Sequence, residues 1–399
     1  MSPRQSGNEE KWTRFGRSIW PMHDRPTDSY PNARRWQLTR LDWQGLSNTL
    51  RVKCNIARRF PITMTITNRQ IRLAARPVGM PKDSDWNLTT EPVRAIVDGE
   101  VLVKIIYVSL DPAMRGWMND SKSYMVPVGV GEVMRAGVLG TVVASKNAGF
   151  AIGDHVIGML GVQQYAVSDG TGLTRFDSRR APLPVYLGAL GMPGMTAYFG
   201  LLEIGRPQPG ETVVVSGAAG AVGSVVGQIA RIKGCRVVGI AGGPTKCDYV
   251  SKGLRFDAVI DYKAENVKAA LAQACPNGID VYFDNVGGEI LDAALERLAL
   301  GARVIICGAV SQYNNTGPTE GPSNYLSLLV NRASMTGMLV FDYHARYGEA
   351  VREIAGWMAA GQLISTEDIV VGIEKFPQAL LMLFKGENMG KLILRVNDV

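Results

Sequence analysis

Short apolar segments separated by glycine and proline occupy the chain from Ile96 to about Val167. Three of them, Val101–Val108, Gly137–Ala144 and Gly153–Gly158, have the apolar and β-branched content of strands. Turn residues at this density between short strands are typical of a compact, mostly β domain. We therefore expect a β domain in this part of the chain.

From about Leu187 the pattern changes to apolar strands that alternate with helices, after a helical stretch with small residues at Gly194–Gly200. The predicted strands cover 212–216, 236–240, 258–260, 280–283 and 302–307, and the predicted helices cover 221–233 and 266–274. This alternation predicts an α/β domain with a doubly wound parallel sheet. The last segment, from Thr366, has strand-like ends at 369–371 and 391–396 around a helix at 377–384, and could return to the first domain.

A glycine-rich turn joins the first of these strands to the first of these helices. The sequence Ala218-x-Gly220-x-x-Gly223 matches the dinucleotide-binding motif, with alanine at the first glycine position. Gly220 lets a pyrophosphate approach the backbone, and the helix N-terminus offers free N–H groups to the phosphates. The position between a buried strand and a helix supports a nucleotide site, although a glycine-rich turn without a nucleotide is the alternative.

The second strand of the sheet distinguishes NAD from NADP. An NAD site places an acidic residue there to bind the ribose 2′-hydroxyl, but Val237–Thr245 contains none. Lys246, at the end of the following loop, can pair with a 2′-phosphate, unless it is a plain surface lysine. We therefore predict NADPH as the cofactor. The runs Asp284–Gly288 and Ile305–Tyr313 also follow strands, where ligands bind in such folds, although the first could be a simple tight turn.

The distribution of cysteine and histidine argues against a catalytic zinc site. Residues 64–190 contain no cysteine and one histidine, His155, so three ligands of this type cannot be assembled there. The five cysteines of the chain form no C-x-x-C pair and are expected to be reduced thiols. NADPH without a metal can deliver a hydride to a carbon that is already electrophilic, as in an alkene conjugated to a carbonyl or in a quinone.

The chain from Asn68 to Val396 resembles the zinc-independent medium-chain dehydrogenases/reductases. The subgroup is that of leukotriene 12-hydroxydehydrogenase/15-oxoprostaglandin 13-reductase and bacterial curcumin reductase. The motifs that carry the resemblance are Ser109–Trp117, Lys122–Tyr124 with Gly131–Met134, Ala218–Ser224, Asp284–Gly288, Cys307–Asn314 and Gly386–Lys391. The resemblance implies a GroES-like β domain (64–187 and 358–399) and an NADPH-binding Rossmann domain (188–357), with the cofactor in the cleft between them.

The resemblance also implies which residues contact NADPH. The pyrophosphate is expected on the first turn of the helix, and the 2′-phosphate and adenosine near Lys246 and Tyr262. The ribose and nicotinamide are expected against Asn285 and the run that follows the 302–307 strand. The full set is Ala221, Val222, Gly223, Ser224, Lys246, Tyr262, Asn285, Cys307, Gly308, Ala309, Val310, Ser311, Gln312, Tyr313, Met338, Leu339, Val340 and Asn388.

Two tyrosines are candidates for the acid that protonates the enolate. A phenol can donate or relay a proton, and Tyr124 and Tyr313 both stand in the motifs. Tyr124 could also be a packing aromatic, Tyr313 could bind only the nicotinamide ribose, and water could serve instead. Some animal members carry a tyrosine at the position of Val330, so that donor does not transfer to this chain.

The residues and the resemblance together predict an NADPH-dependent reductase of the C=C bond of enals and enones, and the resemblance implies curcumin-like or 15-oxoprostaglandin-like substrates. A quinone reductase on the same fold is the alternative. No run of 18 apolar residues predicts a membrane helix. The resemblance implies a homodimer. A cytoplasmic location, a small-molecule substrate and no nucleic-acid partner are expected.

Net charge changes this picture only for the N-terminus. The whole excess of +7 lies in residues 1–63, which contain ten arginines, two lysines and five acidic residues. These residues have no counterpart in the family. They could be a basic arm, an organelle presequence or an extension from a start codon placed too early. We favour the last, because the orderly pattern begins at Met64. A non-catalytic protein that binds anions through this arm is the alternative of another class.

Overall fold

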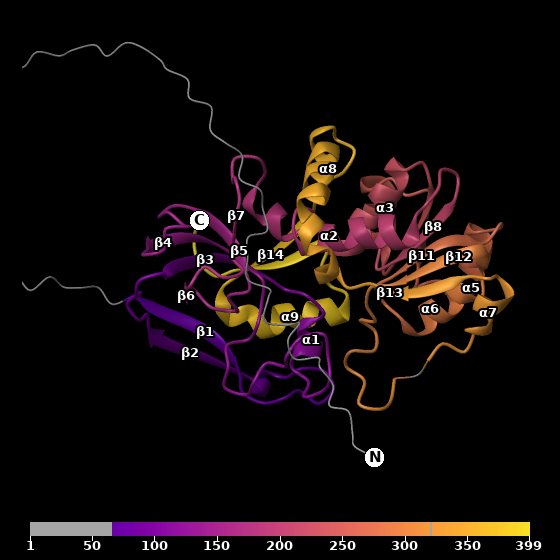
Figure 1. Cartoon of the computed structure of the whole chain (residues 1–399). Helices are drawn as coiled ribbons and strands as arrows, with labels where there is room; N and C mark the ends of the chain where they lie inside the picture. Colours follow the sequence, from indigo (N-terminus) through magenta and orange to yellow (C-terminus); the bar gives the residue numbers. More distant parts are fainter. Residues whose placement is uncertain (1–65, 320) are drawn as a thin grey trace, which may run out of the picture.

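The computed structural model describes residues 66–319 and 321–399, and the expectations for residues 1–63 and Met64 lie outside this part. The described chain forms two parts that lie side by side, each built on its own sheet (Figure 1). The α/β fold class predicted from the sequence is confirmed. In the described ranges, no helix is long and apolar enough to cross a membrane.

The second part contains a six-stranded parallel sheet with strand order β10-β9-β8-β11-β12-β13. Its strands are β8 (Thr212–Ser216), β9 (Arg236–Ala241), β10 (Ala258–Asp261), β11 (Ile279–Asp284), β12 (Leu298–Ile306) and β13 (Ser334–Gly337). The chain reverses its direction across the sheet between β8 and β11. In open α/β sheets, ligands bind beyond the carboxyl ends of the strands at such a switch point.

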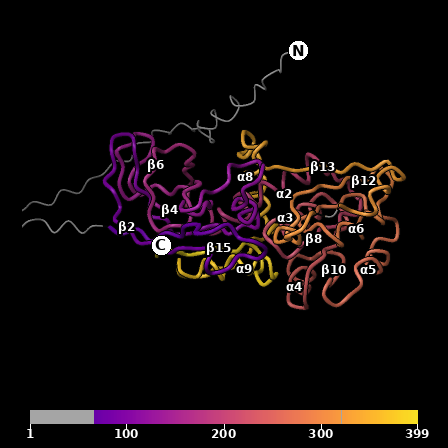
Figure 2. The backbone as a smooth tube through the Cα atoms, turned by 90° about the horizontal axis from the view of Figure 1, so that it is seen from below, coloured from indigo at the N-terminus to yellow at the C-terminus, as the bar shows by residue number. Residues whose placement is uncertain are grey.

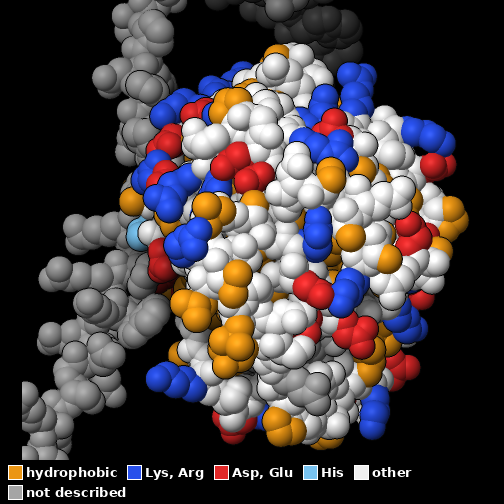
Figure 3. All heavy atoms as spheres, turned by 90° about the vertical axis from the view of Figure 1, so that its right-hand side faces the viewer, with side chains coloured by type: hydrophobic (Ala, Val, Ile, Leu, Met, Phe, Trp, Pro, Cys, Tyr) orange, Lys and Arg blue, Asp and Glu red, His pale blue; other side chains and the backbone are white. Residues whose placement is uncertain are grey.

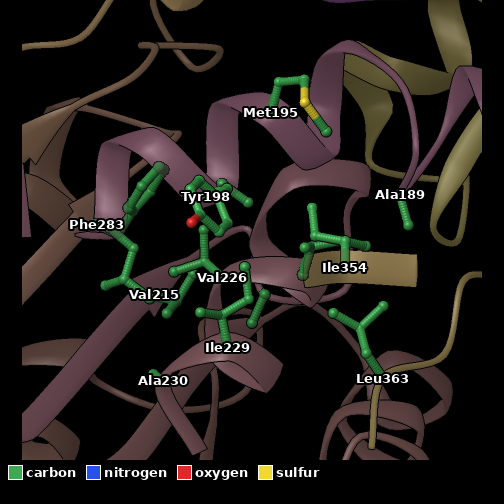
Figure 4. Packing of buried hydrophobic residues seen from close by; sticks show 14 of the residues in the cluster. Ala189, Met195, Tyr198, Val215, Val226, Ile229, Ala230, Phe283, Ile354 and Leu363 are labelled. Carbon is green, nitrogen blue, oxygen red and sulfur yellow. The ribbon is translucent and has the colours of Figure 1, made fainter. Parts of the chain in front are cut away.

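Helices cover both faces of this sheet. Successive residues of its strands point to opposite sides, so the strands are buried against helices on both faces. Val213 and Val215 pack into one core with α2 (Met192–Phe199), α3 (Ala221–Ile232) and α8 (Tyr347–Ala359). Figure 4 shows this core, with Val226 and Ile229 of α3 against Val215 and Tyr198. Val214 packs into the other core, with α5 (Val267–Ala274) and α6 (Gly288–Leu295).

The first part contains a sheet of order β14-β15-β3-β4-β5-β7, with β6 paired to β3, and a separate β1–β2 pair. Its strands are β1 (Thr67–Leu73), β2 (Trp86–Pro92), β3 (Val101–Ser109), β4 (Val138–Ser145), β5 (His155–Gly158), β6 (Tyr165–Ser168), β7 (Thr174–Arg175), β14 (Glu367–Val371) and β15 (Lys391–Arg395). Helix α9 (Phe376–Lys385) lies beside β15 within this part, although both come from the end of the chain (Figure 2).

The strands and helices predicted from apolar pattern agree with the structure to within a few residues. Elements with a weaker pattern were not predicted. They are β1, β2, β6, β7, β13, α6, α8, the short helices α1 (Met114–Trp117), α4 (Pro244–Asp248) and α7 (Leu326–Val330), the π-helical turns Gly200–Gly205 and Tyr249–Gly253, and the 3-10 turns Asp83–Asp85, Leu183–Leu187, Val340–Arg346 and Ile373–Lys375.

Candidate active site

A cleft of about 1210 Å³ runs between the two parts at the carboxyl ends of the parallel strands. One wall is formed by the loops that follow β8, β9, β11 and β12. The opposite wall contains Leu110–Ala113, Trp117 and Tyr124 from the first part, together with the chain around Asn388. The cleft therefore collects residues from segments that are far apart in the sequence.

The glycine-rich loop after β8 brings the start of α3 to this cleft. Ala221, Val222 and Gly223 line it, and the N-cap residue Gly220 provides no side chain to cap the helix. A side chain at position 223 would lie 2.3 Å from the carbonyl oxygen of Gly217, so the close helix–strand packing requires glycine there. The first-turn N–H groups of α3 face the cleft and are available to an anion.

Ser224, the fourth residue predicted in this turn, lies deeper in the helix. Its backbone N–H donates to the oxygen of Gly220 at 3.0 Å, and its side chain is buried. It does not line the cleft. The structure therefore brings the first three residues of α3 to the site and leaves Ser224 in the packing behind them.

Lys246 and Tyr262 form a basic corner at the end of the cleft near β9 and β10. Burial, and next the charge of Lys263, lower the pKa of Lys246. Among the described residues, no carboxylate lies within 4 Å of its ammonium group. A side chain on Gly242 would lie 2.6 Å from the Tyr262 ring, so glycine leaves room for this tyrosine. The corner therefore offers positive charge to an anion.

A buried carboxylate organises the switch point between β8 and β11. Asp284 accepts hydrogen bonds from the Ser216 hydroxyl at 2.8 Å and from the backbone N–H of Gly287 at 3.1 Å. Asn285 lies next to it and donates its amide to the oxygen of Ser216 at 2.7 Å. These bonds fix the Asn285 side chain at the cleft, where the sequence predicts a cofactor contact.

The loop after β12 brings Cys307 and Tyr313 to the same region. The backbone N–H of Ala309 donates to the Tyr313 hydroxyl oxygen at 3.2 Å, and burial raises the pKa of this tyrosine. Burial raises the pKa of Cys307 to about 12, so its thiol stays protonated at neutral pH. Ala309 does not itself line the cleft, whereas Gly308, Val310, Ser311 and Gln312 do.

Tyr124 lies on the opposite wall, in the loop that follows α1. Its hydroxyl oxygen accepts a hydrogen bond from the Trp117 indole N–H at 3.3 Å. Its ring lies 6.4 Å from that of Phe341, which belongs to the second part of the chain. Burial raises the pKa of Tyr124, which keeps the phenol in its acid form. Both candidate proton donors therefore line one cleft.

The chain that precedes β15 completes the site. Asn388 donates its amide to the oxygen of Gly390 at 3.1 Å, and the N–H of Gly390 donates to Ala219 in the glycine-rich loop at 2.8 Å. Met338, Leu339 and Val340, which the resemblance assigns to the cofactor, also line the cleft. The end of the chain is thus attached directly to the loop that the sequence assigns to the pyrophosphate.

Two buried charged residues at the cleft, Lys391 and Asp111, are not among the site residues predicted from the sequence. Lys391 donates from its ammonium group to the Asp111 carboxylate at 2.6 Å and to the oxygen of Leu110 at 2.7 Å. Both residues stand inside motifs that carry the family resemblance, which was the available signal. Their pairing could not be read from it, because 280 residues separate them.

The residues at the cleft fit a dinucleotide that carries an additional phosphate. The first turn of α3 suits a pyrophosphate, because no side chain caps its N–H groups and Gly223 allows the helix to start close to its strand. The lysine corner suits the additional phosphate, since no carboxylate of the described residues forms an ion pair with Lys246 within 4 Å. In the described ranges, no group of three or more His, Cys, Asp or Glu side chains could hold a metal ion. His155 lies in β5 beside Phe176, outside the cleft lining.

Comparisons with known proteins show the family of this chain. Residues 69–176 match a family model described as the N-terminal domain of oxidoreductase, and residues 221–356 match one described as zinc-binding dehydrogenase. The chain is 43% identical over 334 residues to NADPH-dependent curcumin reductase of Escherichia coli (strain K12), covering 82% of this chain and 97% of the relative. It is 40% identical over 338 residues to the NADP(+)-dependent 2-alkenal reductase of Nicotiana tabacum, covering 83% and 98%.

A solved structure extends the comparison to three dimensions. The crystal structure of CurA in complex with NADPH from Vibrio vulnificus superimposes with a TM-score of 0.80 at 45% identity. The match covers 83% of this chain and 100% of that chain. The chain therefore belongs to the medium-chain dehydrogenases/reductases, in the zinc-independent subgroup that includes the curcumin and 2-alkenal reductases.

Proposed function

We propose that this protein reduces the carbon–carbon double bond of α,β-unsaturated aldehydes and ketones with NADPH. The observation that carries the proposal is the composition of the cleft. An anion-binding helix start and a lysine corner lie on one wall, and the phenol of Tyr124 lies on the other. The names of the similar proteins, a curcumin reductase and a 2-alkenal reductase, support the same chemistry.

In this proposal the first turn of α3 binds the pyrophosphate, and Lys246 pairs with the 2′-phosphate. Tyr262 flanks the adenosine end, Asn285 and the loop after β12 line the ribose and nicotinamide, and Met338–Val340 and Asn388 close the site. NADPH, when bound, supplies the hydride that adds to the β-carbon of the enone. Charge then accumulates on the carbonyl side of the substrate, where a proton must arrive.

The chain supplies that proton from a phenol at the cleft. Tyr124 is the better placed of the two candidates, because it lies on the wall of the cleft opposite the loop after β12 and so faces a substrate bound between the two walls. Tyr313 accepts a backbone hydrogen bond within the loop that is proposed to enclose the nicotinamide. Donation from Tyr124 leaves a phenolate in the enzyme and a saturated aldehyde or ketone as product. Solvent then returns a proton to the phenolate.

The division of the chain into domains is part of the proposal. A catalytic GroES-like domain would comprise 64–187 and 358–399, and an NADPH-binding domain would comprise 188–357. The pairing of β15 with β3 supports the return of the chain to the first domain. We propose that the protein is located in the cytoplasm. The described cysteines form no disulfide, as is usual for proteins in that reducing compartment.

We further propose that the protein is a homodimer that forms through the edge strand β13. All four residues of β13 are exposed, and Leu329 and Val330 of the adjacent α7 are 75% and 69% exposed. Figure 3 shows this side of the molecule, with hydrophobic side chains gathered on it. An unpaired edge beside apolar side chains favours pairing with a second copy.

A substrate panel tests the proposed activity. Purified enzyme is mixed with NADPH and with enals, enones, a curcuminoid and a quinone, and the saturated products are identified by mass spectrometry. We expect oxidation of NADPH coupled to saturation of the enone double bond. Turnover of the quinone without any enone would instead assign the protein to the quinone reductases.

A further inference from the structure

The family motif Ser109–Trp117 ends with Trp117, a residue to which the proposed function assigns no role. Trp117 is the last residue of α1, and its side chain is 3% exposed. Its indole N–H donates to the hydroxyl oxygen of Tyr124 at 3.3 Å. We propose that Trp117 is a positioning residue for proton transfer, and that it acts through Tyr124. This inference rests on the proposed function.

The direction of this hydrogen bond determines where the tyrosine proton can go. An indole nitrogen is only a donor, so it must supply the hydrogen and Tyr124 must supply the lone pair. The hydroxyl hydrogen of Tyr124 therefore points away from Trp117. No acceptor for it exists among the described residues, and the hydroxyl lies at the cleft. A substrate oxygen or carbanion in the cleft can take that place.

The same hydrogen bond also stabilises the product of proton transfer. After donation, Tyr124 carries a negative charge on the oxygen that faces the indole N–H. A donor already in place stabilises this charge without reorganisation. Burial raises the pKa of Tyr124 and the Trp117 hydrogen bond opposes this effect, which keeps the phenol protonated yet able to donate.

Trp117 is buried in a hydrogen-bonded turn, whereas Tyr124 is partly exposed and its hydroxyl is bonded to Trp117. The backbone N–H of Val128 donates to the oxygen of Trp117 at 2.8 Å, and Arg115 in the same turn donates to Pro77 and to Asn314 at 3.1 Å. Tyr124 lies in an irregular loop, and its side chain is 43% exposed. The hydrogen bond from the buried indole therefore fixes the position of the Tyr124 hydroxyl.

A double-mutant cycle on Trp117 and Tyr124 tests this role. Trp117→Phe removes the N–H donor and keeps an aromatic ring. We expect kcat for enone reduction to fall about three- to ten-fold, with KM for NADPH unchanged. The alkaline limb of the pH profile should move to higher pH, because the Tyr124 phenol loses a hydrogen bond that lowers its pKa. In the Tyr124→Phe background, Trp117→Phe should have almost no further effect.

Trp86 provides a matched control for loss of an indole. It is buried in the same part of the chain, against Phe376, and lies outside the cleft lining. Trp86→Phe should leave kcat and the pH profile unchanged. If Trp117→Phe does not fold, Trp117→Met replaces it, since Met fills apolar space without a donor.

The outcomes separate this inference from the proposed function. An equal loss from Trp117→Phe with and without Tyr124, or an unmoved alkaline limb, would overturn the role of Trp117. Full activity of Tyr124→Phe would overturn the role of both residues while leaving the reductase activity intact. Absence of enone reduction by the wild-type enzyme would overturn the proposed function itself.

Discussion

Lys391 and Asp111 form a buried ion pair that joins the last strand of the chain to the loop after β3, with 2.6 Å between the ammonium nitrogen and the carboxylate oxygen. Their side chains are 2% and 11% exposed. The residue before Lys391 donates to the glycine-rich loop at Ala219. The pair therefore connects the wall that carries Tyr124 to the loop proposed to bind the pyrophosphate.

Breaking this pair on one side should destabilise the protein strongly. Lys391→Met leaves the Asp111 carboxylate buried without its partner, which costs about 3–5 kcal/mol of unfolding free energy. The double variant Lys391→Met/Asp111→Asn removes both charges, so its loss should be smaller than the sum of the single losses. Urea unfolding measures all three. Additive losses, or a Lys391→Met variant as stable as the wild type, would show that the pair is not a buried charge couple.

Removal of the Lys246 charge should weaken NADPH binding selectively. Lys246→Met removes the cation proposed to pair with the 2′-phosphate, so kcat/KM for NADPH should fall about ten- to hundred-fold. The activity with NADH, which lacks this phosphate, should change little. The exposed Lys252, which pairs with Asp248 one turn away, provides the control variant Lys252→Met. An equal loss for both cofactors would contradict the assignment of the 2′-phosphate to this corner.

The Glu211–Arg303 pair should make stability depend on pH. Burial is the largest single effect on the pKa of Glu211 and raises it, but the hydrogen bonds from Arg303 and from the Gln208 backbone N–H, together with the charge of Arg303, outweigh burial and the net pKa is lowered. A folded-state pKa below the unfolded value adds stability above the unfolded pKa, and that stability is lost as pH falls through the folded pKa. Glu211→Gln should therefore lose about 1 kcal/mol at neutral pH and little in acid. Unfolding curves of both proteins across acidic and neutral pH measure this difference, and a pH-independent difference would refute it.

The proposed dimer should depend on the apolar face of α7. Leu329→Glu introduces charge beside the β13 edge, so the dimer should dissociate into monomers in size-exclusion chromatography with light scattering. Ile152→Glu, at a position 70% exposed in the other part, is the matched control and should leave the dimer intact. A monomeric wild-type protein, or a dimer that tolerates Leu329→Glu, would contradict this interface.

The sequence predicts the parts of the fold whose signal is local. The β8 strand and the α3 helix were predicted at their observed positions, because a run of β-branched residues and a glycine-rich turn need no distant partner. The edge strand β13 was not predicted, since its four exposed residues show neither alternation nor an apolar run. Its strand conformation depends on hydrogen bonds with β12.

The candidate site follows the same rule. Most of the cofactor residues predicted from the motifs line one cleft, because the motifs follow strands whose carboxyl ends meet at one edge. Ser224 and Ala309 lie behind the lining, since a motif does not specify which side of a turn faces the cleft. The Lys391–Asp111 pair and the Trp117–Tyr124 bond depend on tertiary packing, which a single sequence does not specify.

Transfer of a labelled hydride tests the central claim most directly. The enzyme is given NADPH that carries deuterium at both hydrogen positions of the nicotinamide C4, together with an α,β-unsaturated ketone, and the product is examined by NMR. We expect a saturated ketone with deuterium at the β-carbon and a solvent-derived hydrogen at the α-carbon. Deuterium at the carbonyl carbon with the double bond intact, or no transfer to any enone, would contradict it.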